Sequence, residues 1–145
     1  MDGRRRRVML LDTHVWIWAA ADARRIGAQT RRLLDRQAAA GRVCVSAISA
    51  FEISALCAAG RLVLNQPAER WIRDSIERGN LRIINVNTDA AMDAGALGHE
   101  ALPDPIDRLL VAAARDAELA LVTRDRRMLE FAKRTKMVRV HDAGR

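Results

Sequence analysis

Residues 8–14 read Val-Met-Leu-Leu-Asp-Thr-His, and this stretch decides the fold. Four apolar residues end at an aspartate, which is typical of a short buried strand that stops at a polar edge. Similar apolar runs recur at residues 43–45, 81–86, 120–122 and 138–140, and helical patterns lie between them at 13–21, 24–40, 46–59, 67–78, 88–97, 104–117 and 125–133. This alternation predicts an α/β fold with a central parallel sheet that helices cover on both faces, a three-layer α/β/α arrangement.

Local signals mark several helix ends. Asp104-Pro105 is typical of a helix start, with aspartate as the cap and proline at the first helical position. Either Ser46 or Ser49 is expected to cap the helix that runs to about residue 59, and Ser49-Ala-Phe-Glu52 has the form of a capping box. Thr13 and Thr88 are the expected caps of two further helices.

Length and composition indicate one domain. The chain has 145 residues, of which half are apolar, enough for a core without disulfides or metal staples. Cys44 and Cys57 lie in apolar runs without metal-ligand or disulfide spacing, so we expect buried, reduced thiols and a cytoplasmic protein. Asp12 and His14 interrupt the apolar run that follows the N-terminal arginines, which excludes an export signal, and no uncharged stretch is long enough to span a bilayer.

The charge of the chain is basic and comes almost entirely from arginine. Lys and Arg number 25 against 18 Asp and Glu, giving a formal net charge of +7. Such a balance is compatible with a phosphate-bearing partner, and equally with an ordinary solvated surface. Residues 1–7 hold four of the arginines and form a basic N-terminal tail, while 8–141 form the domain. The tail is either an RNA-binding arm, a misassigned start or an expression remnant, and a disordered tail is favoured.

Four carboxylates are expected to converge at one edge of the sheet. Asp12 and Asp125 follow the first and fourth strands, Asp107 lies in the first turn of a helix, and Glu52 lies one turn into another. Ligands of open parallel sheets bind at the carboxyl ends of the strands. Each acid alone also suits a helix N-terminus, and Glu52 suits the capping box. Together, two carboxylates about 5 Å apart would repel by roughly 3 kcal/mol. A compensating Mg²⁺ or Mn²⁺ follows, which suits phosphodiester hydrolysis.

Four blocks of the chain resemble the PIN-domain ribonucleases, and most closely the VapC toxins of bacterial toxin–antitoxin pairs. The blocks are Leu-Leu-Asp-Thr-His-Val-Trp at 10–16, Ser-Ala-Ile-Ser-Ala-Phe-Glu-Ile at 46–53, Asp-Pro-Ile-Asp-Arg-Leu-Leu-Val-Ala-Ala-Ala at 104–114 and Leu-Val-Thr-Arg-Asp at 121–125. They occur in the family's order, and the resemblance extends from about residue 8 to 140.

The resemblance implies a metal-dependent endoribonuclease with a PIN-like fold. Asp12 and Asp107 match the family's principal metal ligands, and Glu52 and Asp125 match its further acids. Thr123 stands where the family often has a small hydroxyl near the metal. The resemblance also implies an RNA substrate, a cognate antitoxin as protein partner and a homodimer.

Two other classes of protein with an acidic edge do not fit the sequence. A phosphotransfer receiver would need a lysine at a late strand end, and a haloacid-dehalogenase-like phosphatase would need Asp-x-Asp after the first strand; the chain has neither. A catalytically idle PIN-fold module that acts through protein or RNA contacts stays open as the alternative. Retention of all four acids argues against it, because an idle site has no evident reason to keep their mutual repulsion.

Overall fold

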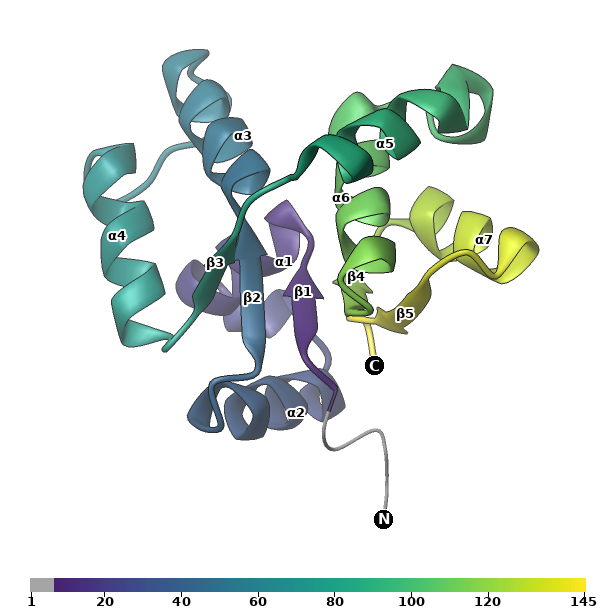
Figure 1. Ribbon diagram of the computed structural model, residues 1–145. Coiled ribbons are helices and arrows are strands. Elements are labelled where there is room, and N and C mark those ends of the chain that lie inside the picture. The colour runs from purple at the N-terminus through teal and green to yellow at the C-terminus, as the bar shows by residue number, and fades with distance from the viewer. Residues whose placement is uncertain (1–6) are drawn as a thin grey trace.

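A parallel sheet organises the computed structural model, which describes residues 7–145. Within that range the strands are β1 (Met9–Leu11), β2 (Val43–Ser46), β3 (Arg82–Ile84), β4 (Ala120–Thr123) and β5 (Arg139–Asp142), in the order β3-β2-β1-β4-β5. Every neighbouring pair is parallel, and Leu10 is in register with both Cys44 and Leu121. The predicted parallel α/β fold is confirmed (Figure 1).

Helices connect the strands and cover both faces of the sheet. They are α1 (Thr13–Ala21), the short 3₁₀ helix η2 (Ala23–Arg25), α2 (Ala28–Ala39), α3 (Ala47–Ala58), α4 (Ala68–Arg78), α5 (Thr88–Ala101), α6 (Pro105–Asp116) and α7 (Arg126–Thr135). In Figure 1, α6 crosses in front of β4 and α1 is seen behind the sheet. In the described part of the chain, no helix has the length and apolar character needed to cross a membrane.

Alternation along the central strands builds two cores. Met9 and Leu11 pack on one face of the sheet, whereas Leu10 between them packs on the other. The first face meets side chains of α1, α2, α3 and α4, and the second meets α6 and α7. Because successive side chains of a strand point to opposite faces, three consecutive apolar residues in β1 are enough to anchor both layers. The edge strands differ, since β3 is mostly exposed and β5 is only half-buried.

Trp16 on α1 is buried in the first core together with Trp71 and Ile72, so α4 packs its apolar side inward. The side chain of Trp16 also donates a hydrogen bond from Nε1 to Ser75 Oγ, 3.0 Å away. Trp18, on the same helix, is only half-buried, with His14 on one side and the Arg25 guanidinium 5.7 Å from its ring centre.

The structure corrects several predicted helix ends. The helix expected over 24–40 begins at Ala28, because Ile26 is buried in the core and Gly27 lies against the chain's last residues. A Cβ at Gly27 would lie 1.8 Å from the Arg145 carbonyl oxygen, so only glycine fits there. Asn87 rather than Thr88 caps α5, through a bond from the Ala90 backbone N–H to its side chain, 2.8 Å long.

Two segments at the chain ends bear on the predicted domain limits. Of the predicted tail at residues 1–7, residues 1–6 lie outside the described residues. The Arg7 carbonyl accepts a hydrogen bond from Gln37 Nε2 on α2, 3.1 Å away. At the other end, the chain beyond residue 141 continues to pack: β5 extends to Asp142, and the Thr30 backbone N–H donates to the Arg145 carbonyl at 3.0 Å.

Candidate active site

Asp12 lies at the carboxyl end of the central strand β1, between that strand and α1. Its side chain is only 6% exposed, and Oδ2 accepts a hydrogen bond from the Thr123 hydroxyl at 2.8 Å. Burial raises the pKa of this carboxyl, while the Thr123 bond and the charge of nearby His14 act in the opposite direction. Asp12 precedes α1 as its N-cap residue without forming a side-chain capping bond, so Thr13 is the first helical residue and not the expected cap.

Asp107 lies in the first turn of α6 and faces the other acids. Its pKa is raised to about 8, first by burial and then by the negative charges of Asp104, Asp12, Asp125 and Glu52. These acids come from the ends of three different strand–helix connections and from the cap of α6 itself. The charges of these acids all act on the Asp107 carboxyl. The four acids predicted from the sequence therefore lie at one edge of the sheet.

Glu52 is half-buried on α3 and has no capping role. Ser46 caps α3 instead, since the Ile48 backbone N–H donates to its Oγ at 3.1 Å, so the capping box expected over residues 49–52 is wrong. Ser49 is fully buried, and its Oγ accepts a hydrogen bond from Thr13 Oγ1 at 2.8 Å. This bond ties the helix that carries Glu52 to the residue next to Asp12. The hydrogen bond between Thr13 and Ser49 is not predicted from the sequence, although a spacing of three residues places Ser49 and Glu52 on the same side of α3.

Asp125 combines a structural role with a place at the site. It caps α7 by accepting hydrogen bonds from the backbone N–H groups of Arg127 and Met128, at 2.8 and 3.3 Å. Both bonds use Oδ1. The Asp125 backbone N–H in turn donates to Thr123 Oγ1 at 3.0 Å. One threonine hydroxyl at the end of β4 thus orients both the Asp12 carboxylate and the start of α7.

Asp104 differs from Asp107 in exposure and in partner. It is exposed and caps α6, because its Oδ1 accepts a hydrogen bond from the Ile106 backbone N–H at 2.9 Å. Pro105 follows at the first helical position, as predicted. The two aspartates therefore differ in the structure: Asp104 is exposed and caps α6, whereas Asp107 is half-buried in the first turn.

The donor set suits a hard cation that keeps part of its water shell. Within residues 7–145, no three carboxylate, histidine or cysteine side chains are close enough together to surround one ion. Mg²⁺ is usually held through one or two carboxylates and several waters, so such a cage is not required. Asp12 and Asp107 supply two carboxylates. Burial and neighbouring negative charges raise the pKa of both, and a bound cation would offset these effects by stabilising the ionised carboxylates.

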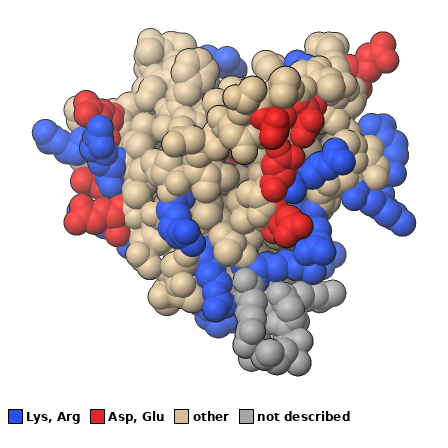
Figure 2. Space-filling model, viewed as in Figure 1, with Lys and Arg blue, Asp and Glu red and all other residues tan. Residues whose placement is uncertain are grey.

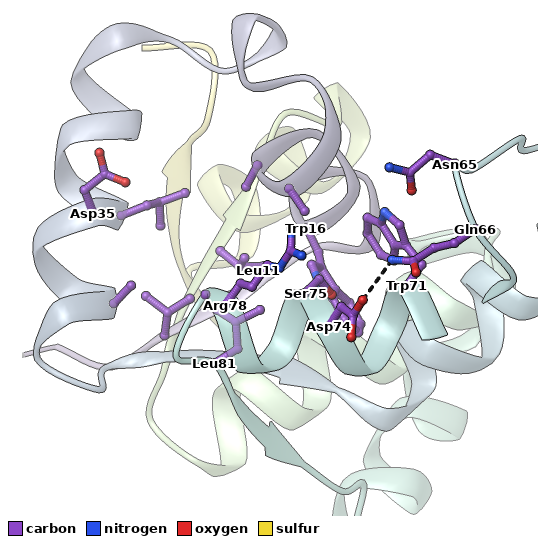
Figure 3. Close-up of a pocket in the computed structure, with 16 residues that line it drawn as sticks. Leu11, Trp16, Asp35, Asn65, Gln66, Trp71, Asp74, Ser75, Arg78 and Leu81 are labelled. Atoms are coloured by element: carbon purple, nitrogen blue, oxygen red, sulfur yellow. Dashed lines mark hydrogen bonds between the residues drawn. The ribbon is translucent and has the colours of Figure 1, made fainter. Parts of the chain in front are cut away.

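A separate cavity of about 360 Å³ lies on the face of the sheet that α1, α2 and α4 cover (Figure 3). Its apolar walls include Leu11, Trp16 and Leu81, and its rim carries both charge signs. Gln66 donates a hydrogen bond to Asp74 at this rim, 3.1 Å long. Because Leu11 directly precedes Asp12, this cavity and the acidic edge share one strand.

Comparison with known proteins now settles the family. The profile of the PIN domain matches residues 9–134. The chain belongs to the PIN-domain family. It is 32% identical over 120 residues to Ribonuclease VapC22 of Mycobacterium tuberculosis. The aligned segment covers 83% of this chain and 88% of that protein.

Solved structures share the PIN fold at lower sequence identity. The DNA-bound VapBC complex of Salmonella typhimurium contains a chain with a TM-score of 0.65 and 21% identity, covering 92% of this chain and 96% of that one. VapBC2 of Rickettsia felis, bound to a promoter DNA fragment, gives a TM-score of 0.68 at 16% identity, with 92% and 97% covered. FitAcB of Neisseria gonorrhoeae gives a TM-score of 0.61 at 20% identity, with 93% of this chain and 97% of that one covered. These neighbours therefore share the fold of this chain.

Proposed function

We propose that this PIN-domain protein is a metal-dependent endoribonuclease and the toxin of a toxin–antitoxin pair. One observation supports it most: Asp107 has a pKa of about 8, raised first by burial and then by the charges of the other acids at this edge, which are Asp104, Asp12, Asp125 and Glu52. The relative from Mycobacterium tuberculosis is named a ribonuclease. With Cys44 and Cys57 both unpaired, we place this activity in the reducing cytoplasm.

In this proposal Asp12 and Asp107 hold Mg²⁺ or Mn²⁺, and Glu52 and Asp125 act on the surrounding water or on a second ion. A bound divalent cation polarises a phosphoryl oxygen and lowers the pKa of water, which supplies a nucleophile near neutral pH. Asp107 must lose its proton before it can bind a cation, so binding is coupled to proton release.

The chain's own residues position this chemistry. The Thr123 hydroxyl fixes the Asp12 carboxylate, and the Thr13–Ser49 bond fixes α3 relative to α1, and with it Glu52. Asp125 can cap α7 and orient water at the same time, because capping uses only its Oδ1 atom. A rigid arrangement of this kind reduces the reorganisation needed when the transition state forms.

The decisive experiment is cleavage of a labelled single-stranded RNA by the purified chain with Mg²⁺, with Mn²⁺ and after chelation with EDTA. We expect cleavage with either ion, none in EDTA, and loss of most activity in Asp12→Asn. Asp35→Asn, an exposed aspartate on α2, is the matched control and should cleave normally. Full activity after exhaustive chelation would reject the metal mechanism, and RNA binding without any cleavage would favour the idle PIN module.

An antitoxin partner is part of the same proposal, because the solved neighbours are toxin–antitoxin complexes. We propose that the antitoxin covers the acidic edge with a C-terminal segment and a basic side chain. The cavity among α1, α2 and α4 offers that segment an apolar site one strand residue from Asp12. Co-expression with the neighbouring gene of its native operon should yield a complex that does not cleave RNA. A fully active chain that captures no such product would contradict this assignment.

A homodimer is the last part of the proposal. Phe51 on α3 and Met92 on α5 are 64% and 61% exposed, and Ile83 on β3 is 46% exposed. Large apolar side chains exposed at neighbouring elements are typical of a surface that a second chain covers. Trp71 and Ile72 on α4 are buried in the core of the single chain, so they are not part of this surface.

A further inference from the structure

The end of the sheet opposite the carboxylates carries a second cavity, of about 520 Å³. Arginines from four separate segments line it: Arg7 before β1, Arg36 on α2, Arg139 on β5 and Arg145 at the last described position. Figure 2 shows Lys and Arg side chains gathered along the lower edge of the molecule, where α2 and the start of β1 lie in Figure 1. The two ends of one short sheet therefore carry opposite charge.

Among the described residues, no carboxylate forms an ion pair with the arginines of this cavity. The ion pairs found within residues 7–145 all involve other arginines, namely those of Asp22 with Arg24 and Arg25, and of Glu69 with Arg73. Asp142, next to His141 on β5, accepts a hydrogen bond on its Oδ1 from the Gly144 backbone N–H at 2.8 Å. His141 also lines the cavity, and its pKa is lowered by burial and by the charge of Arg145. Within residues 7–145, the cavity therefore gathers positive charge without an ion-paired carboxylate.

The frame around these arginines is built by contacts between distant segments. Gln37 Nε2 holds the Arg7 carbonyl, and the Thr30 backbone N–H holds the Arg145 carbonyl at 3.0 Å. Thr30 Oγ1 also lies 2.8 Å from His141 Nε2. Both ends of the described chain are thus fixed to α2, which holds their arginines at the cavity.

The floor of the cavity is apolar. Met9 and Ala120 are buried at the starts of the neighbouring strands β1 and β4, and Leu33 on α2 is half-buried. A cavity of this volume falls in the range that holds small organic ligands. Guanidinium groups bind phosphate oxygens through paired N–H donors, and an apolar wall suits the face of a nucleobase.

We propose that this cavity binds a nucleotide, with the phosphate on the arginines and the base against Met9, Leu33 and Ala120. The nucleotide is either free in solution or one unit of an RNA strand. This site lies at the far end of the sheet from the carboxylates, and its binding needs neither metal nor cleavage. It therefore stands independently of the proposed nuclease activity.

The test is calorimetric titration of the full chain with AMP, adenosine and inorganic phosphate in metal-free buffer. The test variant is Arg36→Gln/Arg139→Gln, which removes two exposed cavity arginines. The matched control is Arg32→Gln/Arg134→Gln, which removes the same charge from exposed positions of α2 and α7 outside the cavity. Thermal melting should show that both variants fold.

We expect AMP to bind wild type and control alike, more tightly than adenosine or phosphate, and at least tenfold more weakly to the cavity variant. Equal AMP affinity in all three proteins, or no AMP binding, would overturn the site. Phosphate binding as tightly as AMP would overturn the nucleotide assignment. A chain that binds AMP here and cleaves no RNA would refute the nuclease and leave this site standing.

The source of the nucleotide follows from a second measurement, the salt dependence of binding to a short labelled single-stranded RNA. Each phosphate contact on a single strand contributes about −0.7 to the slope of log affinity against log salt. If the cavity holds a unit of RNA, the cavity variant should flatten the slope by about 0.7–1.4 relative to the control. If the ligand is a free nucleotide, the two slopes should agree while AMP affinity still falls.

Discussion

At the scale of single residues, the site depends on which group accepts and which donates. Asp12 and Asp107 both have raised pKa values, but the causes differ in weight. Asp12 is the more buried of the two, and the Thr123 hydroxyl donates to its carboxylate. Asp107 has no such donor among the described residues and faces four other carboxylates. Asp107 is therefore the acid on which the loss of a negative charge should have the clearest effect.

Asp107→Asn should stabilise the metal-free protein above about pH 4. The folded carboxyl has a pKa of about 8 against 3.8 in the unfolded chain, so between these values the folded state binds more protons. Wild-type stability should consequently fall as the pH rises through this window. The asparagine variant should lack that slope and gain about 1–2 kcal/mol near neutral pH, a figure reduced for solvent screening.

Denaturant unfolding at a series of pH values in EDTA measures this effect. Asp35→Asn is the matched control, because Asp35 is exposed on α2 and is not among the charges that act on Asp107. A lower stability of Asp107→Asn at neutral pH would contradict the charge repulsion inferred for the site.

Thr123→Val should reduce RNA cleavage without unfolding the protein. Valine keeps the shape of threonine at the buried end of β4 but removes the donor to Asp12 and the acceptor for the Asp125 N–H. Loss of such a supporting hydrogen bond typically lowers metal affinity or activity by about 10–100-fold. Mg²⁺ titration of cleavage and of stability measures both consequences. Thr123→Ser retains the hydroxyl and should stay close to wild type; equal loss in both variants would point to packing instead.

At the scale of elements, strand ends and helix starts together create the site. Three helix starts converge on this edge: α1 behind Asp12, α6 with Asp107 in its first turn, and α7 behind Asp125. Helix N-termini favour negative charge through their free N–H groups, which offsets part of the repulsion among the acids. The opposite edge holds the chain ends and the arginines. Its geometry depends on the close approach of Gly27 to the C-terminal backbone.

Gly27→Ala should destabilise the protein by about 1–3 kcal/mol, because the added methyl group would overlap the Arg145 backbone and must displace it. The matched control is Gly95→Ala on α5, where a Cβ meets nothing within 4 Å. That control should be neutral or stabilising by up to about 1 kcal/mol, since alanine favours helix. Thermal melting of the two variants makes the comparison. Equal stability would show that the C-terminal residues do not pack on α2 in solution.

At the scale of the whole molecule, the exposed apolar side chains predict self-association. Phe51 lies next to Glu52 on α3, so a second chain on this surface would lie beside the acidic edge. Phe51→Ser/Met92→Ser should shift the wild-type dimer to monomer, which sedimentation velocity at micromolar concentration measures. Val63→Ser, at a side chain that is 90% exposed outside this surface, is the control and should leave the dimer intact. A wild-type monomer at this concentration would contradict the dimer.

The sequence alone determined the alternation of strands and helices, the parallel sheet and the positions of the four acids after strands or in first turns. These features are local, because apolar period and capping residues act over a few neighbouring positions. For this reason the sequence correctly predicts that helices start at Asp104-Pro105 and at Asp125. The helix starting at Ala28 was not, because its start is set by contact of Gly27 with Arg145, 118 residues further along the chain.

Only the tertiary structure decided which side chains support the site. Thr123 and Asp12 are 111 residues apart, and Thr13 and Ser49 are 36 apart. Their contacts exist because β4 and β2 flank β1, an order that no local pattern encodes. The cavity of arginines has the same origin, since its cations come from four segments that meet only when the sheet closes against α2. Folding therefore places acids from distant parts of the sequence at one end of the sheet and arginines from distant parts at the other end.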